Sequence, residues 1–198
     1  MGVYLVSVDA SEWFGADEDD EDSYSELAMA LNEELARRGL APYESVPDEA
    51  PFVRGSGLAF EEKLIPPMDS FLALCKLHLS AEETETLCGW TALVPISLEE
   101  DVHLPVSSGY TEESVVAGAW QVLTVAEKLA AAIELPGEVP EMCDNLDLTM
   151  WFRDGAAKEL AVVRPGPWSV DLDATFYAAL FLRSAQHSIR RGCPIVLT

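Results

Sequence analysis

Helix-forming and strand-forming segments follow one another irregularly along this chain, and this irregularity constrains the fold more than any other feature. Residues 3–8 are a short run of β-branched and aromatic side chains, which predicts a strand. Residues 174–191 carry apolar side chains at helical spacing and end at Gly192, which predicts a long helix. The segments between them do not repeat the strand–helix–strand order of a doubly wound sheet. We therefore expect an α+β fold with four or five helices and a small mixed sheet of short strands.

Residues 23–38 carry the clearest signal for the start of a helix. Ser23 and Glu26 have the spacing of a capping box, in which each side chain bonds a backbone N–H of the first turn. Gly39 supplies the stop, because glycine readily adopts the backbone conformation that ends a helix. The apolar positions repeat every four residues, at Leu27, Leu31 and Leu35.

The remaining elements are expected from capping residues and from short apolar runs. Further helices are predicted over residues 69–79, 81–88, 111–134 (capped by Thr111) and 174–191 (capped by Asp173). Further strands are predicted within residues 90–98, 160–163 and 194–197. Pro95 would place the first of these at an edge of the sheet or at a bulge. Residues 147–152 fit either a helix or a strand.

Residues 40–67 contain five prolines and two glycines, which favours loops and short extended pieces over a long element. The chain of 198 residues is 49% apolar with a mean hydropathy of +0.11, values typical of a folded globular protein. We expect one globular domain over residues 1–198. A boundary between two subdomains, if present, would fall within residues 40–67.

The formal net charge of −23 restricts the classes of partner. Nucleic-acid binders need clustered Lys and Arg, and anionic membranes repel an acidic surface, so we expect neither partner. Residues 1–62 carry 16 acids and 3 bases, whereas residues 160–198 carry four arginines and two aspartates. The mildly basic C-terminal segment is therefore expected to face the acidic N-terminal third, within one chain or between two copies.

No secretory signal and no apolar stretch long enough to span a membrane is visible in the sequence. The four cysteines are far apart and form no CxxC pair, which is typical of reduced thiols. We therefore expect a cytoplasmic protein.

A run of six acids, Asp17 to Asp22, is the most conspicuous chemical feature of the sequence. Counted from Asp17, the glycine and glutamate of a calcium-binding EF-hand loop are replaced by Asp22 and Ala28, so that motif is excluded. The run is better explained as a solvated loop before the helix that follows it. Large aromatic side chains usually belong to the core. Alternatively, the neighbours Trp13 and Phe14 supply apolar anchors beside a charged rim, an arrangement typical of protein interfaces. The candidate partner-binding residues are Trp13, Phe14, Asp17, Asp19, Asp20 and Asp22.

Two sets of side chains resemble metal ligands. Cys75 and His78 share a helix face, and Cys88 and His103 could complete a zinc site, although the spacing matches known zinc sites poorly. Asp171 is a loop acid that could bind a cation. These are weak candidates: the cysteine and histidine fit a core helix equally well, so we expect no metal.

Asp173 and His187 also resemble an acid/base or metal-binding pair. Fourteen residues separate them, which on a helix is about 21 Å. The two side chains therefore cannot share one site. A partly buried histidine is the better interpretation of His187, with pH sensitivity as an alternative role.

The sequence has no recognisable catalytic motif. The stretch RGSGL at residues 54–58 is not a nucleophile elbow, and neither a Walker loop nor a complete GxGxxG pattern occurs. We expect no catalytic residue and no cofactor. The leading hypothesis is an acidic interaction protein that binds a basic protein or a second copy of itself. The alternative is an enzyme, or a protein that binds a small molecule or metal, with a site assembled from residues distant in sequence.

Overall fold

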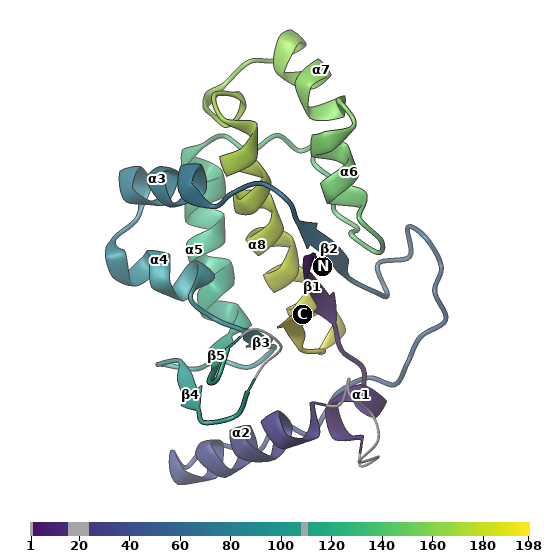
Figure 1. Ribbon diagram of the computed structural model, residues 1–198, viewed down its shortest axis with the longest axis vertical. Helices are drawn as coiled ribbons and strands as arrows, with labels where there is room; N and C mark the ends of the chain where they lie inside the picture. The colour runs from purple at the N-terminus through teal and green to yellow at the C-terminus, as the bar shows by residue number, and fades with distance from the viewer. Residues whose placement is uncertain (1, 16–23, 108–110) are drawn as a thin grey trace.

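The computed structural model describes residues 2–15, 24–107 and 111–198, and these form one mixed sheet with helices on both faces (Figure 1). The strand order is β2-β1-β6-β3-β5-β4; β3 and β5 are parallel, and all other neighbours are antiparallel. The strands are β1 (Val3–Ser7), β2 (Glu61–Leu64), β3 (Ala92–Val94), β4 (Val102–Leu104), β5 (Ser114–Gly118) and β6 (Ile195–Leu197). The expected α+β class is confirmed, with more helices and more strands than expected.

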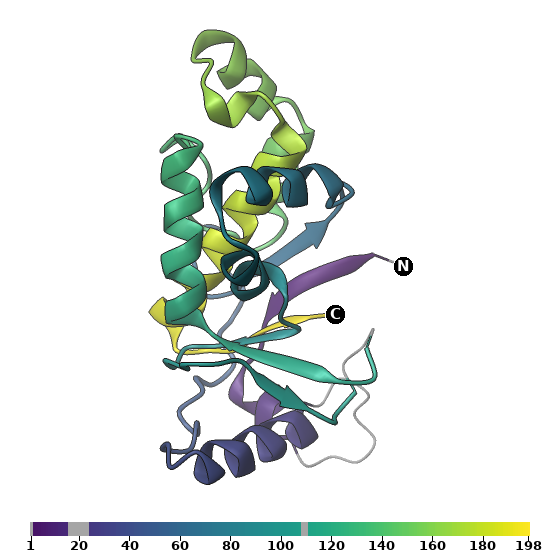
Figure 2. The same cartoon turned by 90° about the vertical axis from the view of Figure 1, so that its left-hand side faces the viewer.

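The helices form two layers of unequal size, as Figure 2 shows. The smaller layer, α1 and α2, covers one face of the sheet, and the larger covers the other. The helices within the described residues are α1 (Ala10–Phe14), α2 (Ser25–Arg37), α3 (Asp69–His78), α4 (Ala81–Cys88), α5 (Ala119–Ala132), α6 (Asp147–Arg153), α7 (Ala156–Val163) and α8 (Leu172–Arg191). A 3₁₀ turn, Pro167–Ser169, precedes α8.

Neighbouring residues of the central strands belong to different cores, because successive side chains of a strand point to opposite faces. In β3, Leu93 packs in the core of the larger layer, while Ala92 and Val94 pack under α2. In β6, Ile195 packs in the core of the larger layer and Val196 packs under α2. Both faces of these strands are buried, so each reads in the sequence as an unbroken apolar run.

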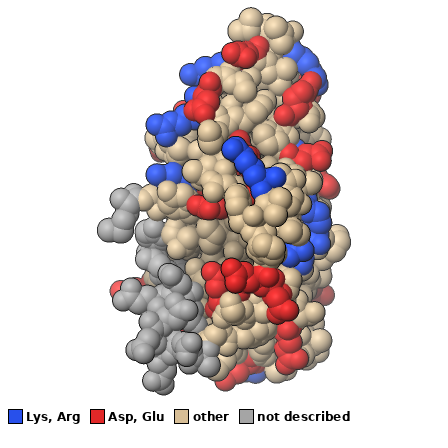
Figure 3. Space-filling view, turned by 90° about the vertical axis from the view of Figure 1, so that its right-hand side faces the viewer, with Lys and Arg blue, Asp and Glu red and all other residues tan. Residues whose placement is uncertain are grey.

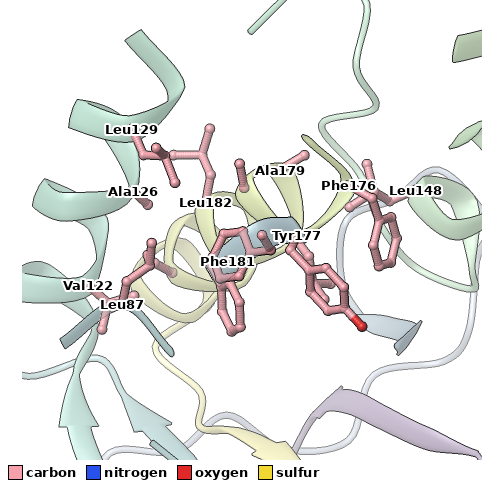
Figure 4. Packing of buried hydrophobic residues seen from close by; sticks show 14 of the residues in the cluster. Leu87, Val122, Ala126, Leu129, Leu148, Phe176, Tyr177, Ala179, Phe181 and Leu182 are labelled. Carbon is pink, nitrogen blue, oxygen red and sulfur yellow. The ribbon is translucent and has the colours of Figure 1, made fainter. Parts of the chain in front are cut away.

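Helix α8 is the centre of the larger core. It follows Asp171, whose side chain accepts a hydrogen bond from the backbone N–H of Ala174 at 3.0 Å, and it ends at Gly192 with φ +71°. Asp171 is thus the cap, not Asp173 as the sequence suggested. Figure 4 shows Ala126 and Leu129 of α5 facing Leu182 of α8. α8 is buried along most of its length, as its many apolar residues in the sequence indicate.

The helix predicted over residues 111–134 is wrong in its first part. Ser114–Gly118 is strand β5, and α5 begins only at Ala119. An added Cβ at Gly118 would lie 2.7 Å from the carbonyl oxygen of Ile96, so this position needs glycine where the chain passes from strand to helix. From their spacing alone, the valines of β5 fit a helix face as well as a strand. Backbone pairing with β3 and β4 favours the strand.

Three other expectations are also corrected or refined. Residues 160–163, predicted as a strand, form the end of α7, where Val162 and Val163 are exposed and no strand partner is present within the described chain. Strand β3 lies in the sheet interior and ends at Val94, so Pro95 creates neither an edge nor a bulge. Helix α2 begins at Ser25; the predicted cap Ser23 lies outside the described residues.

The Pro-rich stretch is mostly irregular, as expected, but it contains β2 and is tied to the rest of the molecule by two buried acids. Glu62 is fully buried and accepts hydrogen bonds from the backbone N–H groups of Leu148 and Thr149, at 2.7 and 2.8 Å. Burial raises the pKa of this carboxyl group, and the hydrogen bonds oppose that effect. Asp144 holds the loop through Gly55 N and Ser56 Oγ. The bonds of Glu62 therefore join β2 to the first turn of α6, and those of Asp144 join the loop before β2 to the segment before α6.

Candidate functional site

An acid-lined cleft of about 130 Å³, the acidic cleft, lies between α1, the loop at residues 47–50 and the end of α8. Four carboxylates and one guanidinium line it, a formal charge of −3; they belong to Asp9, Glu12, Asp48, Glu49 and Arg191. Three separate segments of the chain supply these groups. The basic end of the C-terminal segment therefore meets the acidic N-terminal third within one chain, where β1 also pairs with β6.

The start of α1 fixes two of these carboxylates. Oδ1 of Asp9 accepts hydrogen bonds from the backbone N–H groups of Ser11 and Glu12, at 2.7 and 3.1 Å. In return, Oε2 of Glu12 accepts the backbone N–H of Asp9 at 3.0 Å. This capping box holds both side chains at the N-terminus of α1.

The loop that carries Asp48 and Glu49 is anchored to α2, to the end of α8 and to α1. Asn32 of α2 exchanges two hydrogen bonds with the backbone of Tyr43, whose hydroxyl donates to the carbonyl of Gly192 at 2.9 Å. Further along, the carbonyl of Pro47 accepts the backbone N–H of Ala10 at 2.9 Å. The loop thus brings the next two acids against α1. They are exposed and take part in none of the ion pairs among residues 2–15, 24–107 and 111–198.

The face that bears this loop is acidic over a wider area. Figure 3 shows a band of acidic side chains across its lower half. Phe52 and Val53, in the same loop, expose 59% and 55% of their surface. Apolar side chains therefore stand near the exposed carboxylates of Asp48 and Glu49 on this face.

The predicted partner site around Trp13 is only partly described. Trp13 is fully buried and packs against Tyr24 and Tyr43, with ring centroids 6.5 and 6.1 Å apart, so its ring belongs to the core under α2. Phe14 exposes 39% of its surface and remains accessible to a partner. The four acids predicted beside them, Asp17, Asp19, Asp20 and Asp22, lie outside the described residues.

The structure separates the weak metal candidates. Cys75 is buried, and burial raises the pKa of its thiol to about 11, whereas His78 on the same helix is exposed. Burial likewise raises the pKa of Cys88 to about 12. Asp171 is occupied as the cap of α8. Within the described parts of the chain, no three His, Cys, Asp or Glu side chains converge as a metal site requires.

His187 is a core residue at the far end of α8 from Asp173. It is 1% exposed, its ring packs on Phe60 at 5.5 Å between centroids, and its Nε2 has no hydrogen-bond partner among the described residues. Burial lowers its pKa to about 3, and the positive charges of Arg190 and Arg191 act in the same direction. The imidazole is therefore neutral near pH 7.

A second cavity of about 210 Å³, the cationic pocket, lies between the end of β2 and the helices α6, α7 and α8. Its walls are mainly apolar, and its charged lining residues are two bases and one acid. The lining residues are Ile65, Pro66, Thr149, Phe152, Arg153, Lys158, Leu172, Asp173 and Phe176.

Sequence reasoning missed the charged residues of both cavities except Asp173, which it considered as a helix cap and as a possible partner of His187. Asp48 and Glu49 stand 39 and 37 residues from Asp9 and Glu12, and no local pattern indicates that these acids meet. The sequence indicates Arg153 and Lys158 only weakly: they are the two basic residues between positions 129 and 163, and they stand five residues apart. Only the packing of α6 and α7 shows that both reach one cavity.

Comparison of the chain with protein-family models, curated proteins and solved structures finds no match. Any functional proposal therefore rests on the geometry of the two cavities. In the described part of the chain, no helix combines the length and the apolar composition that crossing a bilayer requires.

Proposed function

We propose that this protein acts by binding a basic segment of another protein at the acidic cleft. The observation that carries the proposal is the convergence of Asp9, Glu12, Asp48 and Glu49 on one cleft with Arg191 as the basic side chain lining it. A lysine or arginine side chain of a partner has the size and charge to enter such a cleft. Complementary charge of this kind speeds encounter and selects among partners.

Exposed apolar side chains next to the cleft support a protein as the partner. Interfaces combine apolar anchors with a polar rim, and aromatic residues contribute much of the binding energy. Phe52 and Val53 follow Asp48 and Glu49 after only two residues, and both are more than half exposed. We assign Phe52 as an anchor and the cleft as the electrostatic part of the same surface.

The net charge supports the same partner class. With 35 acids and 12 bases, the chain repels nucleic acids and anionic lipids at long range and attracts basic proteins. The charge alone would attract any polycation, so the test must separate the cleft from the general charge.

The test compares two double variants that remove the same charge at different places. Asp48→Asn/Glu49→Gln neutralises the cleft, and Asp154→Asn/Glu159→Gln neutralises two exposed acids around α7. Binding of a fluorescent oligoarginine peptide is measured by anisotropy at physiological ionic strength. We expect the cleft variant to bind about tenfold more weakly, since each carboxylate contributes up to about 1 kcal/mol, and the control to bind like the wild type. Equal loss in both variants would refute the proposal.

A further inference from the structure

We propose that the cationic pocket binds a small organic anion with a compact apolar body. This function is separate from partner binding at the acidic cleft. The ligand class follows from three properties of the pocket: a rigid aromatic wall, a rim with excess positive charge, and a volume suited only to a small molecule.

The apolar wall is built from the core itself. Phe152 of α6 and Phe176 of α8 are 8% and 2% exposed, and their rings meet edge to face with centroids 5.7 Å apart. Ile65, Pro66 and Leu172 continue the apolar lining. Because the two rings are held by close packing, they present a preformed surface to an apolar ligand.

Hydrogen bonds hold the surrounding elements in place. The carboxylate of Glu62 binds the first turn of α6, and the hydroxyl of Thr149 donates to the carbonyl of Lys63 at 3.1 Å. On the other side, the hydroxyl of Tyr177 in α8 donates to the carbonyl of Pro66. Since the Thr149 hydroxyl is committed to β2, the charged side chains must supply the polar contacts to a ligand.

The rim carries two cations. The side chains of Arg153 and Lys158 are exposed and form no hydrogen bond or ion pair with any described residue. Asp173 lies on the same lining, so the three charges sum to +1. Two cations that line one pocket, and that have no acidic partner among the described residues, favour an anion there even in a chain of net charge −23.

The volume limits the ligand. About 210 Å³ is below the roughly 300–1,000 Å³ of pockets for drug-sized molecules, so the pocket suits a compact ligand. An aromatic carboxylate can place its ring against Phe152 and Phe176 and its charge between Arg153 and Lys158.

The probe for the test is 3-phenylpropanoate, and the matched neutral compound is 3-phenylpropan-1-ol. Binding is measured by isothermal titration calorimetry, with chemical-shift changes to locate the site. We expect saturable binding of the anion and binding of the alcohol that is weaker by about tenfold, because the alcohol lacks the charge-assisted contacts. Absence of saturable binding of the anion at millimolar concentration would overturn the proposal.

Paired variants separate the rim from the net charge. Arg153→Gln/Lys158→Gln removes the rim cations, while Lys128→Gln/Arg164→Gln removes two cations paired elsewhere with Glu83 and Glu138. We expect the rim variant to bind the anion about tenfold more weakly, close to the alcohol, and the control variant to be unchanged. Asp173→Asn removes the rim acid and is expected to strengthen anion binding. Equal loss in both double variants, or no gain in Asp173→Asn, would contradict the assignment.

Discussion

The acidic cleft and the cationic pocket lie against opposite ends of the same helix, α8, and differ in sign and in construction. Arg191 lies at one site, Asp173 and Phe176 at the other, roughly 25 Å apart along the helix. The cleft takes its charge from exposed side chains of a loop and a short helix. The pocket takes its shape from core aromatics. We therefore expect that charge at the cleft can change with little effect on folding, whereas a change in the aromatic wall of the pocket destabilises the fold.

The largest expected effect contrasts two phenylalanines. Phe176→Ala removes a ring that is 2% exposed from the wall of the pocket and should lower the free energy of unfolding by about 3–5 kcal/mol. Phe52→Ala, in the exposed loop beside the cleft, should change it by no more than about 0.5 kcal/mol. Urea unfolding followed by circular dichroism measures both. Similar losses in the two variants would remove the distinction between the sites.

The next effect concerns the acid that ties β2 to α6 and so supports the pocket. Glu62→Ala leaves the N–H groups of Leu148 and Thr149 buried without their acceptor, and each such group costs about 1–3 kcal/mol. The matched control is Glu61→Ala on the same strand, which is half-buried and whose loss should cost less than 1 kcal/mol, the order of a surface change. Chemical denaturation of both variants tests the difference. If the control is destabilised as strongly, Glu62 has no special role in supporting the pocket.

A smaller, pH-dependent effect is expected at the cleft end of α8. His187 has a pKa near 3 in the folded protein and about 6.5 when unfolded, so the unfolded state binds more protons below pH 6.5. Its contribution to stability is complete above pH 6.5 and is lost as the pH falls toward 3.

His187→Gln removes this titration. Between pH 7 and pH 5 the wild type should lose about 2 kcal/mol more than the variant, at 1.36 kcal/mol per pH unit below pH 6.5. Unfolding free energies at both pH values provide the measurement, and the acidic residues common to both proteins cancel in the difference. Parallel pH profiles would show that the imidazole is not held neutral.

The smallest expected effect on stability is at the cleft itself. Asp48→Asn/Glu49→Gln should leave the free energy of unfolding within about 0.5 kcal/mol of the wild type, because both side chains are exposed and unpaired in the described chain. Thermal and urea unfolding test this directly. A loss of several kcal/mol would show that these acids support the fold, and a weaker binding of oligoarginine could then no longer be assigned to the cleft.

Local signals in the sequence were sufficient for several elements but for neither cavity. The helices around Leu31 and Phe176 and the strand at residues 3–8 follow from side-chain period and from stop residues. The sequence predicts a helix where β5 forms, because Val115 and its neighbours suit both states and only pairing with β3 and β4 favours the strand. The sequence leaves Trp13 open between core and interface, because its burial depends on Tyr24 and Tyr43, which belong to other segments.

By itself, the sequence determined the α+β class, the long C-terminal helix and the strongly acidic charge, because these depend on composition and on contacts between near neighbours in the chain. The tertiary structure alone decided the strand order, the division of the central strands between two cores, and the meeting of Asp48 with Asp9 and of Arg153 with Lys158 and Asp173. Those features join residues far apart in sequence. These arrangements are stabilised by the burial of apolar side chains and by the pairing of strands, which exist only once the chain has folded.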